Sequence, residues 1–463
     1  MPRPQFNQPF PLEPRSRVTA VGPLSRVVLS ALIFLTAQST LATTAVADTI
    51  FVRSGATGTN TGATWADAFT DLQLALTAAN PGDEIWVAAG TYTPAPRPIE
   101  PAQADRTASF FLRTGVALYG GFIGNETLRD QRDIDANPTL LSGDLMGDDA
   151  EDFENNNENS YHVVVALEVD STAIIDGFVI CQGRADGEAL GASPESNEQG
   201  SGVNIYFASP VIRNCTIERN WSFNHGAIND HGDFTLVDSC TFRNNHSAGF
   251  GAGLYIHNHC QTLATNCLFE QNVAAAEGGG AYSRSEHGAM IEGCYFRDNR
   301  AHFGAGSYNA EGSATHIANC TFHGNFAVMG GGGVYTILST VTVSNCIFAE
   351  NTAGIDDKNG GAGSGGSGGG GFWASGGSPL VHDCIFTGNV ASFGGGVYNN
   401  DFAESTVQDC VFIRNFAREA GGLYTLNSPV LVKRCTFTGN TARDGAFAVG
   451  GALSNYFSDA VVT

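Results

Sequence analysis

Nine copies of one short motif, C-x-[FI]-x-x-N, recur between Cys215 and Asn440. Successive copies are 25 to 27 residues apart, except for one interval of 38 residues between Cys346 and Cys384. A fixed period of this size is typical of a solenoid, in which each repeat stacks on the next. The copies begin at Cys215, Cys240, Cys267, Cys294, Cys320, Cys346, Cys384, Cys410 and Cys435.

Each repeat contains three short apolar stretches separated by Gly and Asn, and the apolar residues alternate with a period of two. We therefore predict an all-β fold, a right-handed parallel β-helix with three short strands per coil. Stacking at about 4.8 Å would align the Cys, Phe, Asn and Tyr positions of successive coils into columns. We expect Asn to take the left-handed backbone of one corner and to bond its neighbours in a ladder, and Gly to serve a second corner.

The N-terminus has the pattern of a secretory signal peptide, residues 1–47. Arg15, Arg17 and Arg26 precede an apolar run at residues 27–37, and Ala45-Val46-Ala47 forms an A-x-A cleavage site. The run is too short to span a membrane well, and no second apolar run follows it. We expect a secreted, cell-surface or outer-membrane protein with no transmembrane helix in the mature chain.

Three further segments follow the signal peptide. Residues 48–92 predict first strands and a capping helix whose apolar face includes Leu72 and Leu76 and which ends before Pro81. Residues 93–173 predict irregular first coils with an acidic stretch at 144–158. Residues 174–463 predict regular coils, the first with Phe178 in the Cys position. We expect the array to be truncated and to continue beyond Thr463.

Charge and cysteine content narrow the possible partners. A formal net charge of −23 argues against nucleic acid and anionic lipid as partners and against a polyanionic sugar over the whole surface, although a local basic patch is compatible with it. Eleven cysteines would usually predict disulfides in an exported protein. Nine of them share one inward position, so we predict a column of buried thiols instead.

The paired signals F-x-x-N and G-G-[AILV] resemble the repeats of the chlamydial polymorphic outer-membrane proteins and of exported β-helix proteins in the pectin-lyase-like superfamily. N-terminal phrases such as Gly82-Asp83-Glu84-Ile85-Trp86-Val87 are similar to the openings of such proteins. The resemblance covers residues 49–463. It implies a β-helix and an adhesive or polysaccharide-processing role, but the membrane β-barrel with which the polymorphic proteins end has no counterpart in this sequence.

Chemically active side chains gather where neighbouring coils differ. With the coils aligned on the Tyr position, His231, His257 and Arg284 fall in one row, and Asp233, His259 and Glu286 fall in the next. Such a patch would be able to ligate a metal or to perform acid–base chemistry, with His225 and His246 as neighbours. The alternative is an ordinary polar face. The Tyr column would likewise form either a sugar-binding strip or part of the core.

The last two expectations concern ligands and function. The acidic stretch includes Asp144, Asp148 and Asp152, oxygen donors that would suit Ca²⁺, although a plain acidic loop is the competing interpretation. No ordered polygalacturonase or pectate lyase signature occurs. We therefore expect a non-catalytic surface or matrix protein that presents loops for adhesion or carbohydrate binding. The alternative is a polysaccharide lyase or glycoside hydrolase with its site on residues 225–287.

Overall fold

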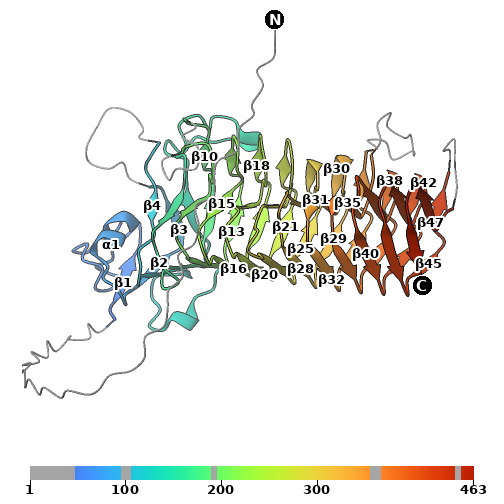
Figure 1. Cartoon of the computed structure of the whole chain (residues 1–463). Coiled ribbons are helices and arrows are strands. Elements are labelled where there is room, and N and C mark those ends of the chain that lie inside the picture. The colour runs from blue at the N-terminus through green and yellow to red at the C-terminus, as the bar shows by residue number, and fades with distance from the viewer. Residues whose placement is uncertain (1–46, 95–105, 189–195, 355–366, 444–449) are drawn as a thin grey trace, which may run out of the picture. The chain divides into compact units, whose positions relative to one another are not determined.

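The computed structural model describes residues 47–94, 106–188, 196–354, 367–443 and 450–463. These residues belong to one compact unit, residues 46–463. Its chain winds into coils stacked along one axis (Figure 1). The predicted signal peptide, except for Ala47, lies outside the described residues. No helix in the described part of the chain is long and apolar enough to cross a bilayer.

Four parallel sheets run along the stack, so a regular coil has four strands and not the three predicted. The fourth strand was missed because it is often two residues long and buries a single small side chain, as Ser222 and Ala274 do. We name the four sheets A, B, C and D, and in each regular coil the chain passes through them in the order A, B, D, C. We call one level of this stack, to which each sheet contributes one strand, a rung.

Sheet A holds 14 strands, and its inward residues include Ile212 and Val237. Its strands are β1 (Thr49–Val52), β2 (Glu84–Ala88), β5 (Ala117–Phe122), β8 (Ile174–Asp176), β12 (Val211–Arg213), β16 (Leu236–Asp238), β20 (Leu263–Thr265), β24 (Met290–Glu292), β28 (His316–Ala318), β32 (Thr342–Ser344), β36 (Leu380–His382), β40 (Ser405–Gln408), β44 (Val430–Lys433) and β48 (Ala460–Val462).

Sheet B holds 12 strands and carries the Phe of the repeated motif. From Phe242 to Phe437 these rings stack with centroids 4.5–4.9 Å apart. Its strands are β3 (Gly90–Tyr92), β6 (Thr139–Ser142), β9 (Val179–Cys181), β13 (Thr216–Glu218), β17 (Thr241–Arg243), β21 (Leu268–Glu270), β25 (Tyr295–Arg297), β29 (Thr321–His323), β33 (Ile347–Ala349), β37 (Ile385–Thr387), β41 (Val411–Ile413) and β45 (Thr436–Thr438).

Sheet D has ten strands and begins at β10, and in the coils before it no described residue between sheets B and C belongs to sheet D. Its strands are β10 (Arg184–Ala185), β14 (Trp221–Ser222), β18 (His246–Ser247), β22 (Val273–Ala274), β26 (Arg300–Phe303), β30 (Phe326–Gly330), β34 (Thr352–Ala353), β38 (Val390–Phe393), β42 (Phe416–Glu419) and β46 (Thr441–Ala442).

Sheet C has 12 strands and carries the Tyr column on its outer face. Its strands are β4 (Phe110–Phe111), β7 (Val164–Leu167), β11 (Val203–Tyr206), β15 (Ile228–His231), β19 (Leu254–Ile256), β23 (Ala281–Ser283), β27 (Ser307–Asn309), β31 (Val334–Ser339), β35 (Phe372–Gly377), β39 (Val397–Asn400), β43 (Leu423–Leu426) and β47 (Leu453–Tyr456).

The Tyr column is neither part of the main core nor an open strip. Its rings form a separate cluster, in which Tyr255, Tyr335 and Tyr424 are only 2–7% exposed. Ring centroids along the column are 4.7–5.6 Å apart. The rings stack from Tyr255 to Tyr335, and the pairs that involve Trp373, Tyr398 and Tyr424 are tilted or edge-on. Because all of these rings are buried, their faces are not available for stacking on a sugar.

The corner between sheets B and D corrects one prediction. The motif Asn is buried in every coil except the last, where Asn440 is partly exposed. Its side-chain amide donates to the Asn oxygen one rung further on, at 2.9–3.2 Å, so the predicted ladder is present. The left-handed backbone belongs instead to the preceding residue, for example Arg219 (φ 50°) or Gln271 (φ 54°). The glycine corner is as predicted: Gly251 has φ 57°, and a Cβ there would lie 2.9 Å from Tyr282 Cβ.

The cysteines form the predicted column of buried thiols. All eleven are unpaired, ten are buried, and Cys435 in the last rung is partly buried. Each thiol of the column contacts a backbone carbonyl; Cys267 Sγ, for instance, lies 3.1 Å from Thr265 O.

A single α-helix, α1 (Leu72–Ala78), lies beside β1, β2 and β4 at the N-terminal end of the described coils (Figure 1). Asp71 begins the helix, because its side chain accepts a hydrogen bond from Gln73 N. Leu72, Ala75 and Leu76 are buried in the main core. The short 3₁₀ helices η1 (Arg129–Gln131) and η2 (Glu151–Phe153) lie in loops.

Candidate functional site

The predicted histidines lie on the outer face of sheet C. In β19, Leu254 and Ile256 belong to the main core, so Tyr255 and the following His257 point outward by the alternation of a strand. The register of β15 with β19 then places His231 beside His257, with ring centroids 4.3 Å apart. The phase that the sequence alone left open is therefore outward.

His225, which was only a neighbour in the predicted patch, joins these two rings, and we call His225, His231 and His257 the imidazole cluster. The His225 ring stacks on Tyr255 with centroids 3.7 Å apart. His225 Nδ1 and His257 Nε2 both donate to Asn229 Oδ1, at 3.2 and 2.9 Å. Burial lowers the pKa of His225 to about 3 and that of His257 to about 2, and it also lowers the pKa of His231. The cluster is therefore uncharged at neutral pH.

The other four members of the predicted patch do not complete this cluster. Their side chains are exposed: Asp233, His259, Arg284 and Glu286. His259 pairs with the His287 ring at 5.1 Å, and the Tyr255 hydroxyl raises the pKa of Arg284. Within the described residues, no hydrogen bond or ion pair joins these four to the imidazole cluster. The cluster therefore has the character of a neutral packing and hydrogen-bonding network.

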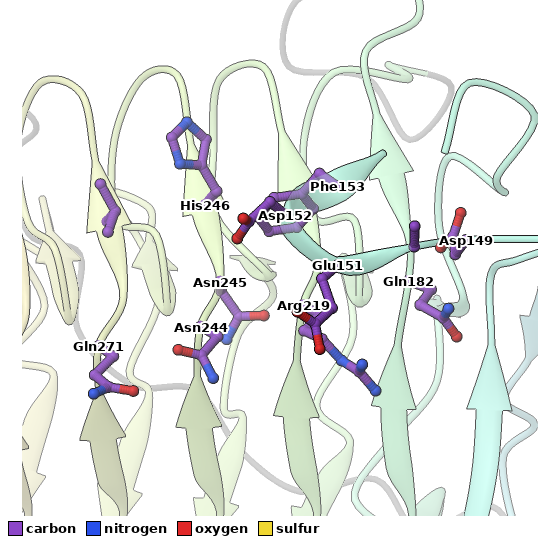
Figure 2. A pocket seen from close by; sticks show the side chains of 12 residues that line it. Asp149, Glu151, Asp152, Phe153, Gln182, Arg219, Asn244, Asn245, His246 and Gln271 are labelled. Carbon is purple, nitrogen blue, oxygen red and sulfur yellow. The ribbon is translucent and has the colours of Figure 1, made fainter. Parts of the chain in front are cut away.

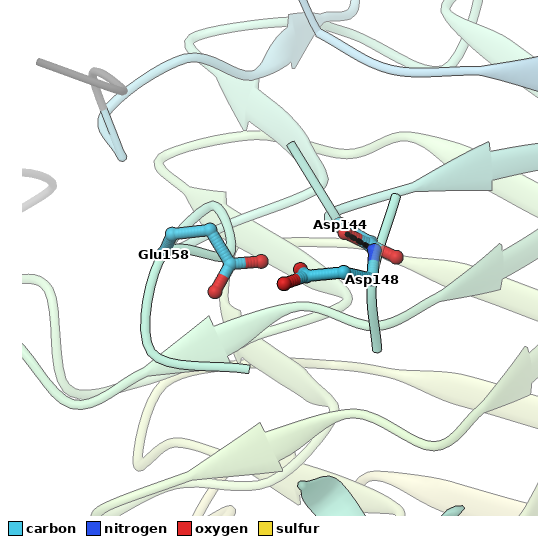
Figure 3. A group of neighbouring side chains, drawn as sticks. All are labelled: Asp144, Asp148 and Glu158. Atoms are coloured by element: carbon cyan, nitrogen blue, oxygen red, sulfur yellow. Dashed lines mark hydrogen bonds between the residues drawn. The ribbon is translucent and has the colours of Figure 1, made fainter. Parts of the chain in front are cut away.

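Possible metal ligands converge elsewhere. Among the described residues, three such side chains bring their ligating atoms within 4.8 Å of one another at one place, formed by Asp144, Asp148 and Glu158 (Figure 3). Asp144 is buried and accepts hydrogen bonds from the backbone of Gly147 and Asp149. Burial, followed by the charges of Asp148 and Asp144, raises the pKa of Glu158. Carboxylate oxygens in this arrangement suit a hard divalent cation.

This triad overlaps only partly with the predicted calcium ligands. Asp144 and Asp148 are members, whereas Asp152 lies apart from them. Glu158 was missed, although it ends the same acidic stretch. Only the turn of residues 144–158 brings Glu158 back to Asp144 and Asp148. No periodicity in the sequence indicates this turn, so Glu158 was not predictable as a ligand.

The acidic loop also forms one wall of a groove of about 770 Å³. Asp149, Glu151, Asp152 and Phe153 make this wall, and Figure 2 shows them crossing in front of the strands of several rungs. The loop turns tightly there, with left-handed backbone at Asp152 (φ 57°) and Phe153 (φ 63°). The Phe153 ring lies 6.1 Å from the His246 ring, so the loop packs on sheet D.

The opposite wall comes from consecutive coils. The residues before four successive corner positions line it: Gln182, Arg219, Asn244 and Gln271. At about 4.8 Å per rung, these side chains extend over roughly 14 Å parallel to the stacking axis. The groove is also lined by Asn245 and by His246 and Val273 of sheet D. The left-handed corner turns these side chains outward while the following Asn stays buried.

The carboxyl group of Asp149 has an unusual environment. Burial, together with the charges of Asp144 and Glu158, raises the pKa of Asp149 to about 6, and Asn159 Nδ2 donates to its Oδ2 at 2.8 Å. Arg219 pairs with Glu218 at 3.3 Å. Burial lowers the pKa of His246, so this imidazole is neutral at pH 7. The groove is thus polar, with its charge concentrated on the loop wall.

Comparison with known proteins supports the architecture. Residues 228–365 match the family model described as the right-handed beta helix region. Together with the four stacked parallel sheets, this match defines a right-handed parallel β-helix. No curated protein matches the sequence.

Three solved structures of polysaccharide-active proteins are among those to which the chain shows a likeness. Pectate lyase Pel9A is 13% identical, with a TM-score of 0.34 over 87% of this chain and 80% of its own. The GH87 α-1,3-glucanase of Streptomyces thermodiastaticus is 13% identical, with a TM-score of 0.38 over 83% and 65%. A rhamnogalacturonan lyase is 12% identical, with a TM-score of 0.31 over 90% and 87%. At such identities and scores, the likeness does not extend to activity.

Proposed function

We propose that this protein binds polysaccharide in the groove between residues 149–153 and the corner side chains of four rungs. The observation that carries the proposal is the repetition of polar side chains along one line. Amide and guanidinium groups at Gln182, Arg219, Asn244 and Gln271 are spaced by the coil repeat, as the hydroxyls of an extended glycan are spaced by its sugar repeat. The Phe153 ring adds an apolar surface, and sites of this kind combine such surfaces with a few oriented polar groups.

The wider role that we propose is that of an exported protein of the cell surface or extracellular matrix, acting in adhesion. It rests on the signal-peptide pattern of residues 1–47 and on the formal net charge of −23 of the chain. A relationship to the polymorphic outer-membrane proteins rests on the F-x-x-N and G-G-[AILV] motifs alone. We also propose that α1 caps the first coil, because Leu72 and Leu76 cover apolar residues that an open end would expose.

A second candidate function, cleavage of the bound glycan, is favoured by one observation. Asp149 combines a pKa of about 6 with a position in the groove, and a carboxylic acid with a raised pKa suits a general acid. Glu151 or Asp152 would serve as the second carboxylate. We therefore propose the groove as the site of this alternative activity, because the uncharged imidazole cluster of residues 225–257 offers less acid–base capacity at neutral pH.

Binding is tested by calorimetry of the purified mature chain with a panel of neutral, acidic and amino-sugar oligosaccharides. We expect Arg219→Gln to weaken binding roughly tenfold, because it removes a charged hydrogen-bond donor. Arg414→Gln is the matched control: both residues precede a ladder Asn with φ near 50°, but Arg414 lies outside the groove. Equal effects of the two variants, or no binding to any glycan, would contradict the proposal.

Cleavage is tested on the same panel by measuring new chain ends over time. If turnover occurs and Asp149→Asn abolishes it while binding persists, the protein is an enzyme. Turnover that survives Asp149→Asn but is lost in His257→Ala would move the site to the imidazole cluster. Binding without turnover would leave the non-catalytic role.

A further inference from the structure

We propose that the glycan bound in the groove carries free amino groups, so that its ligand is a cationic amino-sugar polymer. This inference rests on the proposed function and adds the chemical class of the ligand. It follows from the balance of charges around the groove.

Carboxylates dominate the groove lining. The loop wall contributes Asp149, Glu151 and Asp152, and the last two have exposed side chains. Arg219 is the single positive lining residue within the described chain, because His246 is neutral. Glu151 and Asp152 alone outnumber Arg219, so the lining is net negative even when the Asp149 carboxyl is protonated.

The guanidinium of Arg219 does not neutralise the negative charge of the groove lining. Arg219 is paired with Glu218, whose carboxylate is 10% exposed and is also bonded by Arg243. The Glu218 carboxylate is therefore shared by both arginines and partly neutralises their positive charges. On a chain with a net charge of −23, the long-range potential adds to the local one, and both favour a cation over an anion.

One carboxylate oxygen in the wall also lacks a close donor. Asp149 Oδ1 is buried without a close hydrogen bond among the described residues, although the Gln182 side chain lowers the pKa of this carboxyl by hydrogen bonding, whereas Oδ2 accepts from Asn159. An unpaired buried carboxylate oxygen is costly, and an ammonium group supplies three N–H donors. A neutral sugar hydroxyl would satisfy the hydrogen bond but not the charge. A uronate carboxylate would meet like charge at this wall.

The experiment compares two oligosaccharides that differ only in the amino group. The probes are a β-1,4-linked glucosamine hexamer and its fully N-acetylated counterpart, titrated calorimetrically at mildly acidic pH and low salt. We expect the amino form to bind at least tenfold more tightly. Raising the salt from about 0.05 M to about 0.5 M should remove most of this preference, because the groove is open to solvent and its charges are screened.

Charge-removing variants assign the preference to the groove. The double variant Glu151→Gln with Asp152→Asn should weaken binding of the amino form roughly tenfold, about threefold for each exposed charge, and so narrow its preference over the N-acetylated form. Glu350→Gln is the control, since this carboxylate is 73% exposed but lies outside the groove. Circular dichroism confirms that each variant folds.

The outcomes separate the two proposals. If the N-acetylated or an acidic oligosaccharide binds as tightly as the amino form, the protein binds glycan and the inference about amino groups is wrong. If no glycan of any class binds, the proposed function itself fails. A preference for the amino form that persists unchanged in the double variant would place the cationic site elsewhere and also overturn the inference.

Discussion

At the scale of the residue, the corner between sheets B and D divides its tasks between two neighbours. The first residue takes the left-handed backbone, and its side chain points outward, where it is free to vary; Arg219 and Gln271 line the groove from this position. The second residue is the buried Asn, whose amide joins the rungs. Repetition in the sequence therefore marks the structural residue, and variation marks the functional one.

This division predicts opposite effects for two adjacent substitutions. Asn299 Oδ1 accepts from the backbone and side chain of Asn272, and its Nδ2 donates to Phe269 O and Asn325. Asn299→Ala leaves these buried partners unpaired, so we expect a loss of about 2–4 kcal/mol in the free energy of unfolding. Asp298→Gly relieves a residue with φ 55°, so we expect it to be neutral or slightly stabilising.

Urea unfolding followed by circular dichroism measures both variants. Gly already occupies the Asp298 position in other coils, at Gly324 and Gly388, which supports the choice of control. A destabilisation by Asp298→Gly as large as that by Asn299→Ala would show that the corner backbone, and not the amide ladder, holds the rungs together.

At the scale of the element, the outer face of sheet C changes character along the stack. Its third and fourth strands, β11 and β15, carry Asn204 and Asn229, joined by a hydrogen bond of 2.9 Å, and the later strands carry the Tyr column. The imidazole cluster lies where the two regions meet. His162, fully buried near Asn204, extends the polar region, and burial lowers its pKa to about 4.

These buried neutral imidazoles predict acid sensitivity. Each titrates near 6.5 when unfolded but at about 4, 3 or 2 in the folded chain for His162, His225 and His257. Between pH 6.5 and 4 the unfolded state therefore binds more protons than the folded state. Stability is fully present above pH 6.5 and falls as the pH drops, by about 1.4 kcal/mol per pH unit for each group.

Thermal unfolding as a function of pH tests this expectation. His257→Gln keeps a donor for Asn229 but removes one titrating group, so its stability should fall less steeply below pH 6.5 than that of the unmodified chain. His316→Gln, at an exposed position on sheet A, is the control and should leave the slope unchanged. A slope that does not respond to His257→Gln would mean that this imidazole is already accessible to protons.

At the scale of the whole molecule, the limits of prediction follow from the kind of contact involved. The β-helix, the Phe and Asn columns and the buried thiols were predictable, because each depends on contacts between equivalent positions of neighbouring coils. The triad of Asp144, Asp148 and Glu158 and the groove were not. They depend on how a non-repeating loop folds over coils that lie 30 to 120 residues later in the sequence, at Gln182 to Gln271.

Whole coils should be separable units, because each one contacts only its neighbours in the stack. Deleting residues 320–345 removes one coil and brings Cys346 into the place of Cys320, so the Phe and Asn columns should remain continuous. The deletion lies beyond Gln271, so glycan affinity should stay within about twofold, while the free energy of unfolding decreases because one set of rung contacts is lost.

Deleting residues 240–266 is the matched experiment. It also removes one coil and joins equivalent cysteines, but it takes Asn244 and His246 out of the groove and moves Gln271 one rung closer to the loop wall. We expect both deletion variants to fold, as judged by circular dichroism and cooperative urea unfolding, and only the second to lose glycan binding by more than about tenfold. Equal losses would mean that the ligand contacts the array as a whole. That outcome would contradict a site built where one loop crosses four particular rungs.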